Sequence, residues 1–330
     1  MKSKLKSFIK YIIKLILTLF LIPILILFFL PLILLKYYIK KGVYNFPFIL
    51  YFYDKLKIHI LYDHYYEPLI NPKSVINKRS LETKRDLKLN FDIPSQINLV
   101  NSFDFKKELI DLERAEIKNV PKYCYQNSNF ESGDSEFYYS LIRKLKPSRI
   151  IEIGSGNSTK VALHALNKNK IEFSKEFILT CIEPYEAPWI NEVKEINLIR
   201  KKVECVDVEI FSQLSENDIL FIDSSHIIRP QGDVVFEILN ILPIVKKGVY
   251  IHIHDIFTPY DYCYNWLVNY RLFWNEQYIL EAYLLDNPNI EIIASLNYLS
   301  HDHAEVLSEA FPNYKQRKGC DLGSFWIKKI

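Results

Sequence analysis

The stretch RIIEIGSGNS, residues 149–158, decides the fold of this chain. Its isoleucine-rich first half is typical of a buried parallel strand, which breaks into a turn containing Gly154 and Gly156. Glycine lets a backbone bend sharply and approach a ligand that a Cβ would keep away. A helical pattern follows over about residues 158–166, so the turn would present the backbone amides of a helix N-terminus. The pattern predicts an α/β domain that binds a nucleotide-type cofactor.

The residues around the turn indicate which cofactor it binds. A dinucleotide fingerprint has a third glycine where this chain has Thr159, and the Glu152 carboxylate would repel a pyrophosphate but attract an amino-bearing ligand. Both observations favour S-adenosylmethionine over NAD. Glu183 ends a second apolar run, residues 177–183, and a carboxylate there suits the ribose diol of either cofactor. A glycine turn that binds no ligand is the structural alternative.

Two further apolar runs, residues 219–222 and 248–251, each end in acidic and imidazole side chains. These side chains are Asp223, His226, His252, His254 and Asp255. Ligands of an open parallel sheet bind outside the carboxyl ends of its strands, so we expect these groups to share a crevice with the glycine turn. His252 is the exception, because its position in the strand predicts packing beneath the sheet.

This constellation suits the transfer of a methyl group to a hydroxyl. A neutral imidazole near pH 7 is a competent general base, which makes His226 and His254 candidates, with Asp223 or Asp255 orienting the ring. Alternatively, Asp223, His254 and Asp255 bind a divalent metal such as magnesium, although imidazole is a poor magnesium ligand. The structural alternative is that these groups only cap strand ends.

The glycine motif, the stretch DILFIDSSH at residues 218–226 and the stretch HIHDIF at 252–257 together resemble a class I S-adenosylmethionine-dependent methyltransferase. The resemblance covers about residues 125–330 and is strongest to a bacterial subgroup often associated with glycan and secondary-metabolite modification. It implies a doubly wound, Rossmann-like sheet of seven strands with the last strand antiparallel. The cofactor-binding residues that it implies are Glu152, Gly154 and Gly156 for the methionine part, Glu183 for the ribose, Asp207 near the adenine, and Asp223. His254 departs from the family, where an acid is usual.

Two later segments complete the expected domain. Apolar residues at helical spacing predict one long helix over residues 266–285, with a polar interruption at Asn275-Glu276-Gln277 that we take as a hint of an acceptor site. Residues 290–293 and 324–327 predict the last two strands, as an antiparallel pair at one edge of the sheet.

The N-terminus differs in composition from the rest of the chain. Residues 15–35 form an uncharged apolar run, and about 20 such residues span a bilayer. The run predicts a transmembrane or membrane-anchoring helix, and Pro23 and Pro31 allow a kinked span or an interfacial hairpin. Lysines flank both sides, so charge alone does not orient it.

The expected cofactor orients the chain. Because S-adenosylmethionine is a cytoplasmic metabolite, we expect the catalytic domain to face the cytoplasm from the cytoplasmic membrane. Five cysteines, an odd number, argue against an extracellular disulfide framework and a structural zinc site. A net charge of +3 gives no case for nucleic-acid binding.

The sequence therefore predicts a membrane anchor over residues 1–41, a connecting or lid segment over 42–124, and a methyltransferase domain over 125–330. We expect O-methylation of a small molecule, a sugar or a membrane-linked glycan precursor. The alternatives are a membrane-anchored scaffold without turnover and an NAD-dependent oxidoreductase.

Overall fold

The computed structural model describes residues 10–24, 26–27, 31, 47–57, 66, 68–185, 187–316 and 322–330. The chain divides into two compact units, Met1–Asn71 and Pro72–Ile330. In the first unit, residues 10–24 are helical with exposed apolar side chains, and α2 spans Pro47–Leu56. Within the described part of the chain, no helix is both long enough and apolar enough to cross a membrane. Part of the expected span, including residues 28–30 and 32–35, lies outside the described residues.

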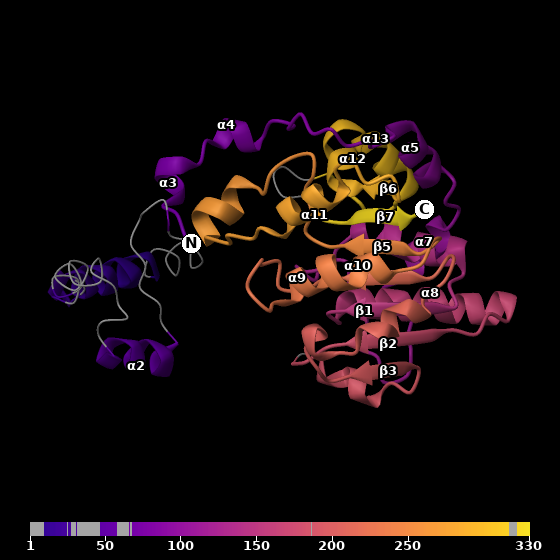
Figure 1. Ribbon diagram of the computed structural model, residues 1–330, viewed down its shortest axis with the longest axis horizontal. Coiled ribbons are helices and arrows are strands. Elements are labelled where there is room, and N and C mark those ends of the chain that lie inside the picture. The colour runs from indigo at the N-terminus through magenta and orange to yellow at the C-terminus, as the bar shows by residue number, and fades with distance from the viewer. Residues whose placement is uncertain are drawn as a thin grey trace, which may run out of the picture. The chain divides into compact units, whose positions relative to one another are not determined.

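The second unit is built on a seven-stranded sheet in the order β3-β2-β1-β4-β5-β7-β6 (Figure 1). The strands are β1 Arg149–Ile153, β2 Ile178–Ile182, β3 Ile196–Ile199, β4 Ile219–Ile222, β5 Tyr250–Ile253, β6 Ile290–Ser295 and β7 Phe325–Lys329. The first five strands are parallel, and β7 runs antiparallel to both β5 and β6. The predicted seven-stranded sheet with an antiparallel last strand is confirmed.

Helices connect the strands and cover the sheet. The α-helices are α3 Pro72–Val75, α4 Lys78–Leu81, α5 Ile93–Asn101, α6 Lys106–Asp111, α7 Asp134–Leu145, α8 Asn157–Phe173, α9 Asp233–Phe236, α10 Leu242–Ile244, α11 Glu276–Leu284, α12 Leu296–Asp302 and α13 Ala304–Ala310. The 3₁₀ helices are η2 Pro188–Glu192, η3 Val203–Cys205 and η4 Val208–Gln213, and the π-helices are η5 Glu237–Ile241 and η6 Asn265–Tyr270.

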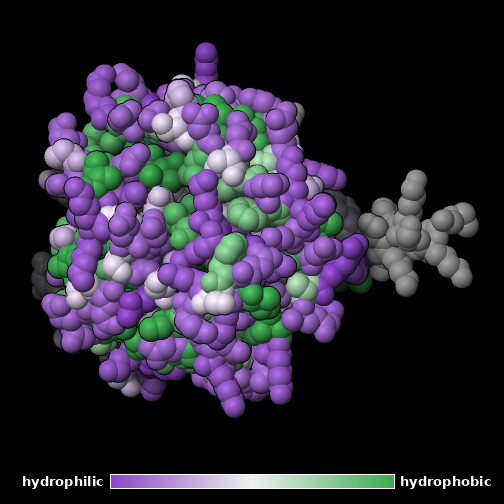
Figure 2. Space-filling view, turned by 90° about the vertical axis from the view of Figure 1, so that its right-hand side faces the viewer, coloured by the Kyte–Doolittle hydropathy of each residue, from purple (hydrophilic) through white to green (hydrophobic). Residues whose placement is uncertain are grey.

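The side chains of β1 alternate between two hydrophobic cores, one on each face of the sheet. Ile150 lies in the core formed with α5, α6, α7, α8, α12 and α13. Ile151 and Ile153 lie in the core formed with η4, α9, η5, α10 and α11. Because helices cover both faces, the domain is doubly wound. Figure 2 shows one face of the molecule, on which hydrophilic residues predominate and hydrophobic ones lie in small groups between them.

The segment before β1 contributes to the first core. Val100, Leu109 and Tyr123 are at most 1% exposed and pack in the same core as Ile150. The boundary expected at residues 124 and 125 therefore does not coincide with an edge of the hydrophobic core. The break between the two compact units lies at residues 71 and 72 instead.

The expectation of one long helix over residues 266–285 is wrong. The π-helix η6 ends where Arg271 adopts a left-handed backbone conformation with φ 57°, and α11 begins only at Glu276. The backbone N–H groups of Asn275 and Glu276 donate to the carbonyl of His226 at 3.0 and 3.3 Å. Because these two N–H groups bond the loop that follows β4, they do not take part in a continuous helix.

Cys263 is disulfide-bonded, whereas Cys124, Cys181 and Cys205 are free. An odd cysteine count therefore does not exclude a disulfide, and the cysteine argument for a cytoplasmic domain loses its weight.

Glu152 of β1 is the most deeply buried acid of the strand-end motifs, with no exposed surface. It accepts a hydrogen bond from the Ser158 hydroxyl, and the Cys181 thiol donates to it at 3.6 Å. Burial raises the pKa of Glu152 to about 7, although these hydrogen bonds oppose the rise.

The close contact at Gly154 predicts a localised loss of stability. A Cβ at this residue would lie 1.9 Å from the backbone oxygen of Asp223, and Gly154 has φ +77°. We expect Gly154→Ala to lower the free energy of unfolding by roughly 2–4 kcal/mol in chemical denaturation. Gly156→Ala is the matched control, because a Cβ there meets no atom within 4 Å. Equal losses in the two variants would contradict this account.

The burial of Glu152 predicts a pH dependence of stability. Its folded-state pKa of about 7 exceeds the ordinary value of 4.5, so folding favours the protonated carboxyl. Its contribution to stability is therefore intact below pH 4.5 and is lost as the pH rises towards 7, by roughly 3 kcal/mol in total. We expect the stability of Glu152→Gln relative to wild type to increase by roughly 2–3 kcal/mol between pH 5 and pH 8. A difference that is the same at both pH values would show that Glu152 ionises normally.

Candidate functional site

A cavity of about 820 Å³ opens at the carboxyl ends of β1, β2 and β4. Its lining includes the turn from Gly154 to Ser158, Glu183 after β2, Val203 of η3, and Asp223 to Ser225 after β4. The sheet order places β2 on one side of β1 and β4 on the other, so the chain reverses direction across the sheet at this point. Ligands of doubly wound folds bind at such a reversal.

The glycine turn is held from both neighbouring strands. Its Gly154 N–H donates to the Ile182 carbonyl at 3.1 Å, and the Asp223 N–H donates to the Ile153 carbonyl at 2.9 Å. Thr159, which replaces the third glycine of a dinucleotide fingerprint, accepts a hydrogen bond from the Gly156 N–H at 2.9 Å. These hydrogen bonds fix the path of the turn between the two strands.

The predicted cofactor residues differ in their relation to this cavity. Gly154, Gly156, Glu183 and Asp223 line it, whereas Glu152 lies behind Ser158 and does not. The Glu183 carboxylate accepts hydrogen bonds from the N–H groups of Ser155 and Tyr185 at 3.2 and 2.8 Å, which fixes it at the cavity wall.

Asp207 lies apart from the cavity. Its carboxylate caps η4 by accepting a hydrogen bond from the Glu209 N–H at 3.1 Å, and its side chain is exposed. The adjoining wall of the cavity is formed by Lys202, Val203 and Glu204 instead. The structure therefore gives Asp207 a local capping role.

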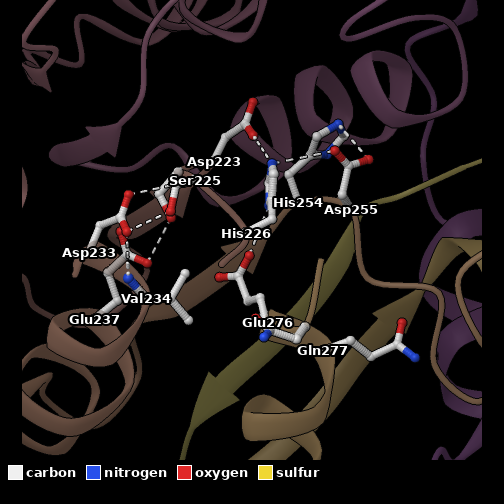
Figure 3. A network of polar contacts seen from close by, with 12 residues as sticks. Asp223, Ser225, His226, Asp233, Val234, Glu237, His254, Asp255, Glu276 and Gln277 are labelled. Carbon is white, nitrogen blue, oxygen red and sulfur yellow. Dashed lines mark hydrogen bonds and ion pairs between the residues drawn. The ribbon is translucent and has the colours of Figure 1, made fainter. Parts of the chain in front are cut away.

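Asp223 and Asp255 meet around the imidazole of His226. The His226 Nε2 atom lies 3.3 Å from Asp223 Oδ1 and 3.5 Å from Asp255 Oδ2. One ligand atom from each of the three residues lies within 4.8 Å of the others. Figure 3 shows these side chains converging from the loops after β4 and β5. The predicted convergence of the two strand ends is thus present.

A third carboxylate approaches His226 from the opposite side. Glu276, the first residue of α11, places Oε2 2.9 Å from His226 Nδ1. Burial disfavours the imidazolium, but the hydrogen bonds to Asp223 and Glu276 and the charge of Asp255 raise the pKa of His226 well above its ordinary value. These contacts favour the protonated imidazole, whereas the role of general base predicted from the sequence requires the neutral form.

Asp223 is the member of this cluster that lines the cavity. Burial favours its neutral form, but the charges of His254 and His226 and a hydrogen bond from His226 hold its pKa below the ordinary value. Asp255 differs, because burial raises its pKa despite the two histidines. Asp223 at the cavity wall therefore favours its ionised form more strongly than Asp255, which is less exposed.

His254 does not occupy the position that the predicted metal site requires. Its Nε2 lies 3.8 Å from Asp255 Oδ1, and the three-residue cluster contains His226 in its place. The His254 ring packs edge-on against Phe130, and its Nδ1 has no hydrogen-bond partner among the described residues. Among the described residues, the cluster with ligand atoms this close therefore contains His226 where the sequence predicted His254.

His252 is packed beneath the sheet, as its position in the strand predicts. Its ring stacks on Phe221 with centroids 4.0 Å apart, and its Nε2 lies 2.9 Å from the Ser324 hydroxyl.

Glu276 was indicated only weakly by the sequence, as part of a polar interruption within an apolar segment. The sequence did not indicate Glu237 and Asp233, which accept hydrogen bonds from the hydroxyls of Ser224 and Ser225 at 2.9 and 2.7 Å. These two acids lie on the helix that follows the loop and hold its serines in place.

The three side chains of the cluster fit a divalent cation. They offer two carboxylate oxygens and one imidazole nitrogen, a mixed set that suits manganese and other first-row metals and, through its oxygens, magnesium. Asp223 is 35% exposed at its side chain and Asp255 17%, so the cavity side of the cluster is open to an incoming ligand.

Comparisons with known proteins agree on the domain. Residues 151–256 match the family model described as a methyltransferase domain. An uncharacterized protein of Archaeoglobus fulgidus is 27% identical over 167 residues, which are 47% of this chain and 73% of that protein. Similar solved structures include the O-methyltransferase from Bacillus cereus in complex with SAH, with 13% identity, coverage of 68% of this chain and 89% of that one, and a TM-score of 0.37. They also include cmcI-D160 Mg-SAM, with 13% identity, coverage of 82% and 89%, and a TM-score of 0.36. Residues 151–256 therefore form a methyltransferase domain, and the chain is an S-adenosylmethionine-dependent methyltransferase.

Proposed function

We propose that this methyltransferase transfers the methyl group of S-adenosylmethionine to a hydroxyl oxygen, with a divalent cation bound at Asp223, His226 and Asp255. One observation carries the proposal. Asp223 belongs both to the wall of the cavity that begins at the glycine turn and to the cluster around His226. A cofactor on the turn and an acceptor at the cluster would therefore meet in one space.

The cavity wall supports the placement of the cofactor. The turn from Gly154 to Ser158 begins α8, whose first N–H groups suit the carboxylate of the methionine part. Glu183, fixed by two backbone N–H groups, suits the ribose diol. Glu152 contributes from behind Ser158, by holding the serine hydroxyl at the cavity wall.

The reaction needs alignment and the removal of one proton. A lone pair of the acceptor oxygen attacks the methyl carbon, the bond from carbon to the sulfonium sulfur breaks, and S-adenosylhomocysteine leaves. Asp223 lines the cavity and its lowered pKa keeps it ionised. Its Oδ1 faces His226, so its second oxygen can accept the hydrogen bond of the acceptor hydroxyl and then its proton. His226 and Asp255 hold Asp223 in position from behind. A bound cation would orient the acceptor oxygen and lower the pKa of its hydroxyl.

We further propose that the acceptor is a small molecule, a sugar or a membrane-linked glycan precursor, and that residues 15–35 anchor the enzyme to the cytoplasmic membrane with its domain in the cytoplasm. The apolar composition of this run and the exposed apolar side chains at residues 10–24 support an anchor. The need for a cytoplasmic cofactor supports the orientation.

Calorimetric titration of the full-length protein tests the cofactor. We expect it to bind S-adenosylmethionine and not NAD. Gly156→Ala should weaken this binding at least tenfold, because its Cβ would project into open space at the cavity wall. Asp207→Asn is the matched control and should bind as the wild type does, since Asp207 lies outside the cavity.

NAD binding would replace the methyltransferase proposal with the oxidoreductase alternative. A folded protein that binds neither cofactor would favour the scaffold. Wild-type affinity in Gly156→Ala would mean that the cofactor does not lie on the glycine turn.

A further inference from the structure

His226 stands in a loop that does not hold its conformation by itself. Its backbone has φ 60°, a left-handed conformation that a non-glycine residue rarely adopts. The N-terminus of α11 stabilises this loop. The His226 carbonyl accepts two N–H groups from Asn275 and Glu276, and the Asn275 side chain accepts the N–H of Ile228 at 2.5 Å.

The imidazole is fixed as firmly as its backbone. Glu276 Oε2 lies 2.9 Å from Nδ1. An ionised carboxylate can only accept a hydrogen bond, so the charged form of Glu276 selects the ring with the hydrogen on Nδ1. The opposite nitrogen, Nε2, lies between Asp223 and Asp255. The ring of Trp274 packs against His226 with centroids 4.4 Å apart, which restricts rotation of the imidazole.

Glu276 is an unusual residue for a purely structural contact. Its side chain is 1% exposed, and its second oxygen, Oε1, has no hydrogen-bond partner among the described residues. Burying a carboxylate with one oxygen unpaired costs free energy that an apolar residue, or a neutral amide with both groups bonded, would not incur. Such a cost is expected where the charge itself has a use.

We propose that Glu276 is the positioning residue of the cation site, which holds the His226 imidazole with Nδ1–H towards α11 and Nε2 towards the gap between Asp223 and Asp255. The arrangement of carboxylate, histidine and cation is a known way to fix a ligating ring and increase its basicity. Figure 3 shows the Glu276 carboxylate and the two aspartates on opposite sides of the ring. The inference rests on the proposed function, because it assigns Glu276 a role in a site whose cation is itself proposed.

The assignment also explains the break in the helical pattern before α11. A continuous helix through residues 271–275 would have its backbone N–H groups bonded within the helix, and Asn275 and Glu276 could not bond His226. Instead, the polar triplet Asn275-Glu276-Gln277 forms hydrogen bonds to two different loops. Gln277 accepts the N–H of Phe257 at 2.8 Å in the loop after β5, while its two neighbours bond the loop after β4. One helix start thereby holds both loops that carry the cluster.

Binding of Mn²⁺ to the full-length protein, followed by the electron paramagnetic resonance signal of the free ion, tests the inference. We expect Glu276→Ala to weaken Mn²⁺ binding 10–100-fold. Glu276→Gln should lie between this variant and wild type, because its amide oxygen can keep the hydrogen bond without the charge. Asp223→Asn, which removes a proposed ligand, sets the scale of a direct loss.

Glu281→Gln is the control for a structural effect. Glu281 is a second buried acid of α11, paired with Arg85 and bonded to Thr258, and it does not contact His226. We expect this variant to unfold more readily than wild type and to bind Mn²⁺ with unchanged affinity. Binding of S-adenosylmethionine should be unchanged in the Glu276 variants, which shows that they are folded.

The outcomes separate the inference from the proposed function. If wild type binds Mn²⁺ and both Glu276 variants bind it equally well, the positioning role is overturned and the cation site stands. If wild type binds no Mn²⁺ while it binds S-adenosylmethionine, the cation part of the proposed function fails, and the role of Glu276 fails with it. If Glu281→Gln loses as much Mn²⁺ affinity as Glu276→Ala, both losses reflect general destabilisation, and the inference is overturned.

Discussion

The rest of the site depends on the close approach of two backbones, the glycine turn after β1 and the start of the loop after β4. The Asp223 N–H donates to the Ile153 carbonyl at 2.9 Å, and the Asp223 carbonyl lies so near Gly154 that no Cβ fits between them. This approach puts the first residue of the acid cluster against the surface that receives the cofactor. A wider separation would leave a cofactor site and an acid cluster without a common space.

The cluster itself gathers three carboxyl groups around one imidazole. Asp223, Asp255 and Glu276 surround His226, and the pKa values of Asp255 and Glu276 are raised because burial and mutual repulsion disfavour their charged forms. A protonated His226 relieves part of that repulsion, and a divalent cation would relieve more. The neighbouring acids Asp233 and Glu237 are bonded to Ser224 and Ser225, so they stabilise the loop rather than extend the cluster. The site would therefore recognise an acceptor by charge as well as by shape.

The central part of this fold could be predicted from the sequence because it rests on local patterns. The four apolar runs that end in glycine, acid or imidazole are the parallel strands β1, β2, β4 and β5, and the antiparallel last strand follows from the family resemblance. The convergence of Asp223 and Asp255 also follows, since neighbouring parallel strands end at the same edge. The chemistry within the site was harder to predict. Which histidine joins the aspartates depends on the left-handed backbone of His226 and on a helix start 50 residues away.

Other differences between the sequence predictions and the structure have the same physical origin. Glu152 has the right position in the motif, but the Ser158 hydroxyl lies between it and the cavity, which no spacing rule reveals. Asp207 has the right residue type in the right region, yet its nearest donor is a backbone N–H of its own helix. The apolar periodicity over residues 266–285 indicated buried side chains correctly but did not indicate the break before α11. The backbone hydrogen bonds that replace those of a helix are made to a loop distant in the sequence.

The central claim is that cofactor and cation share one cavity, with Asp223 between them. The most direct test is the line width of the methyl resonance of ¹³C-methyl S-adenosylmethionine bound to the full-length protein, recorded with and without Mn²⁺. The account predicts that Mn²⁺ broadens this resonance strongly in wild type and leaves it narrow in Asp223→Asn, because a paramagnetic ion broadens only nearby nuclei. A methyl resonance that stays narrow in wild type while both Mn²⁺ and the cofactor are bound would contradict the account.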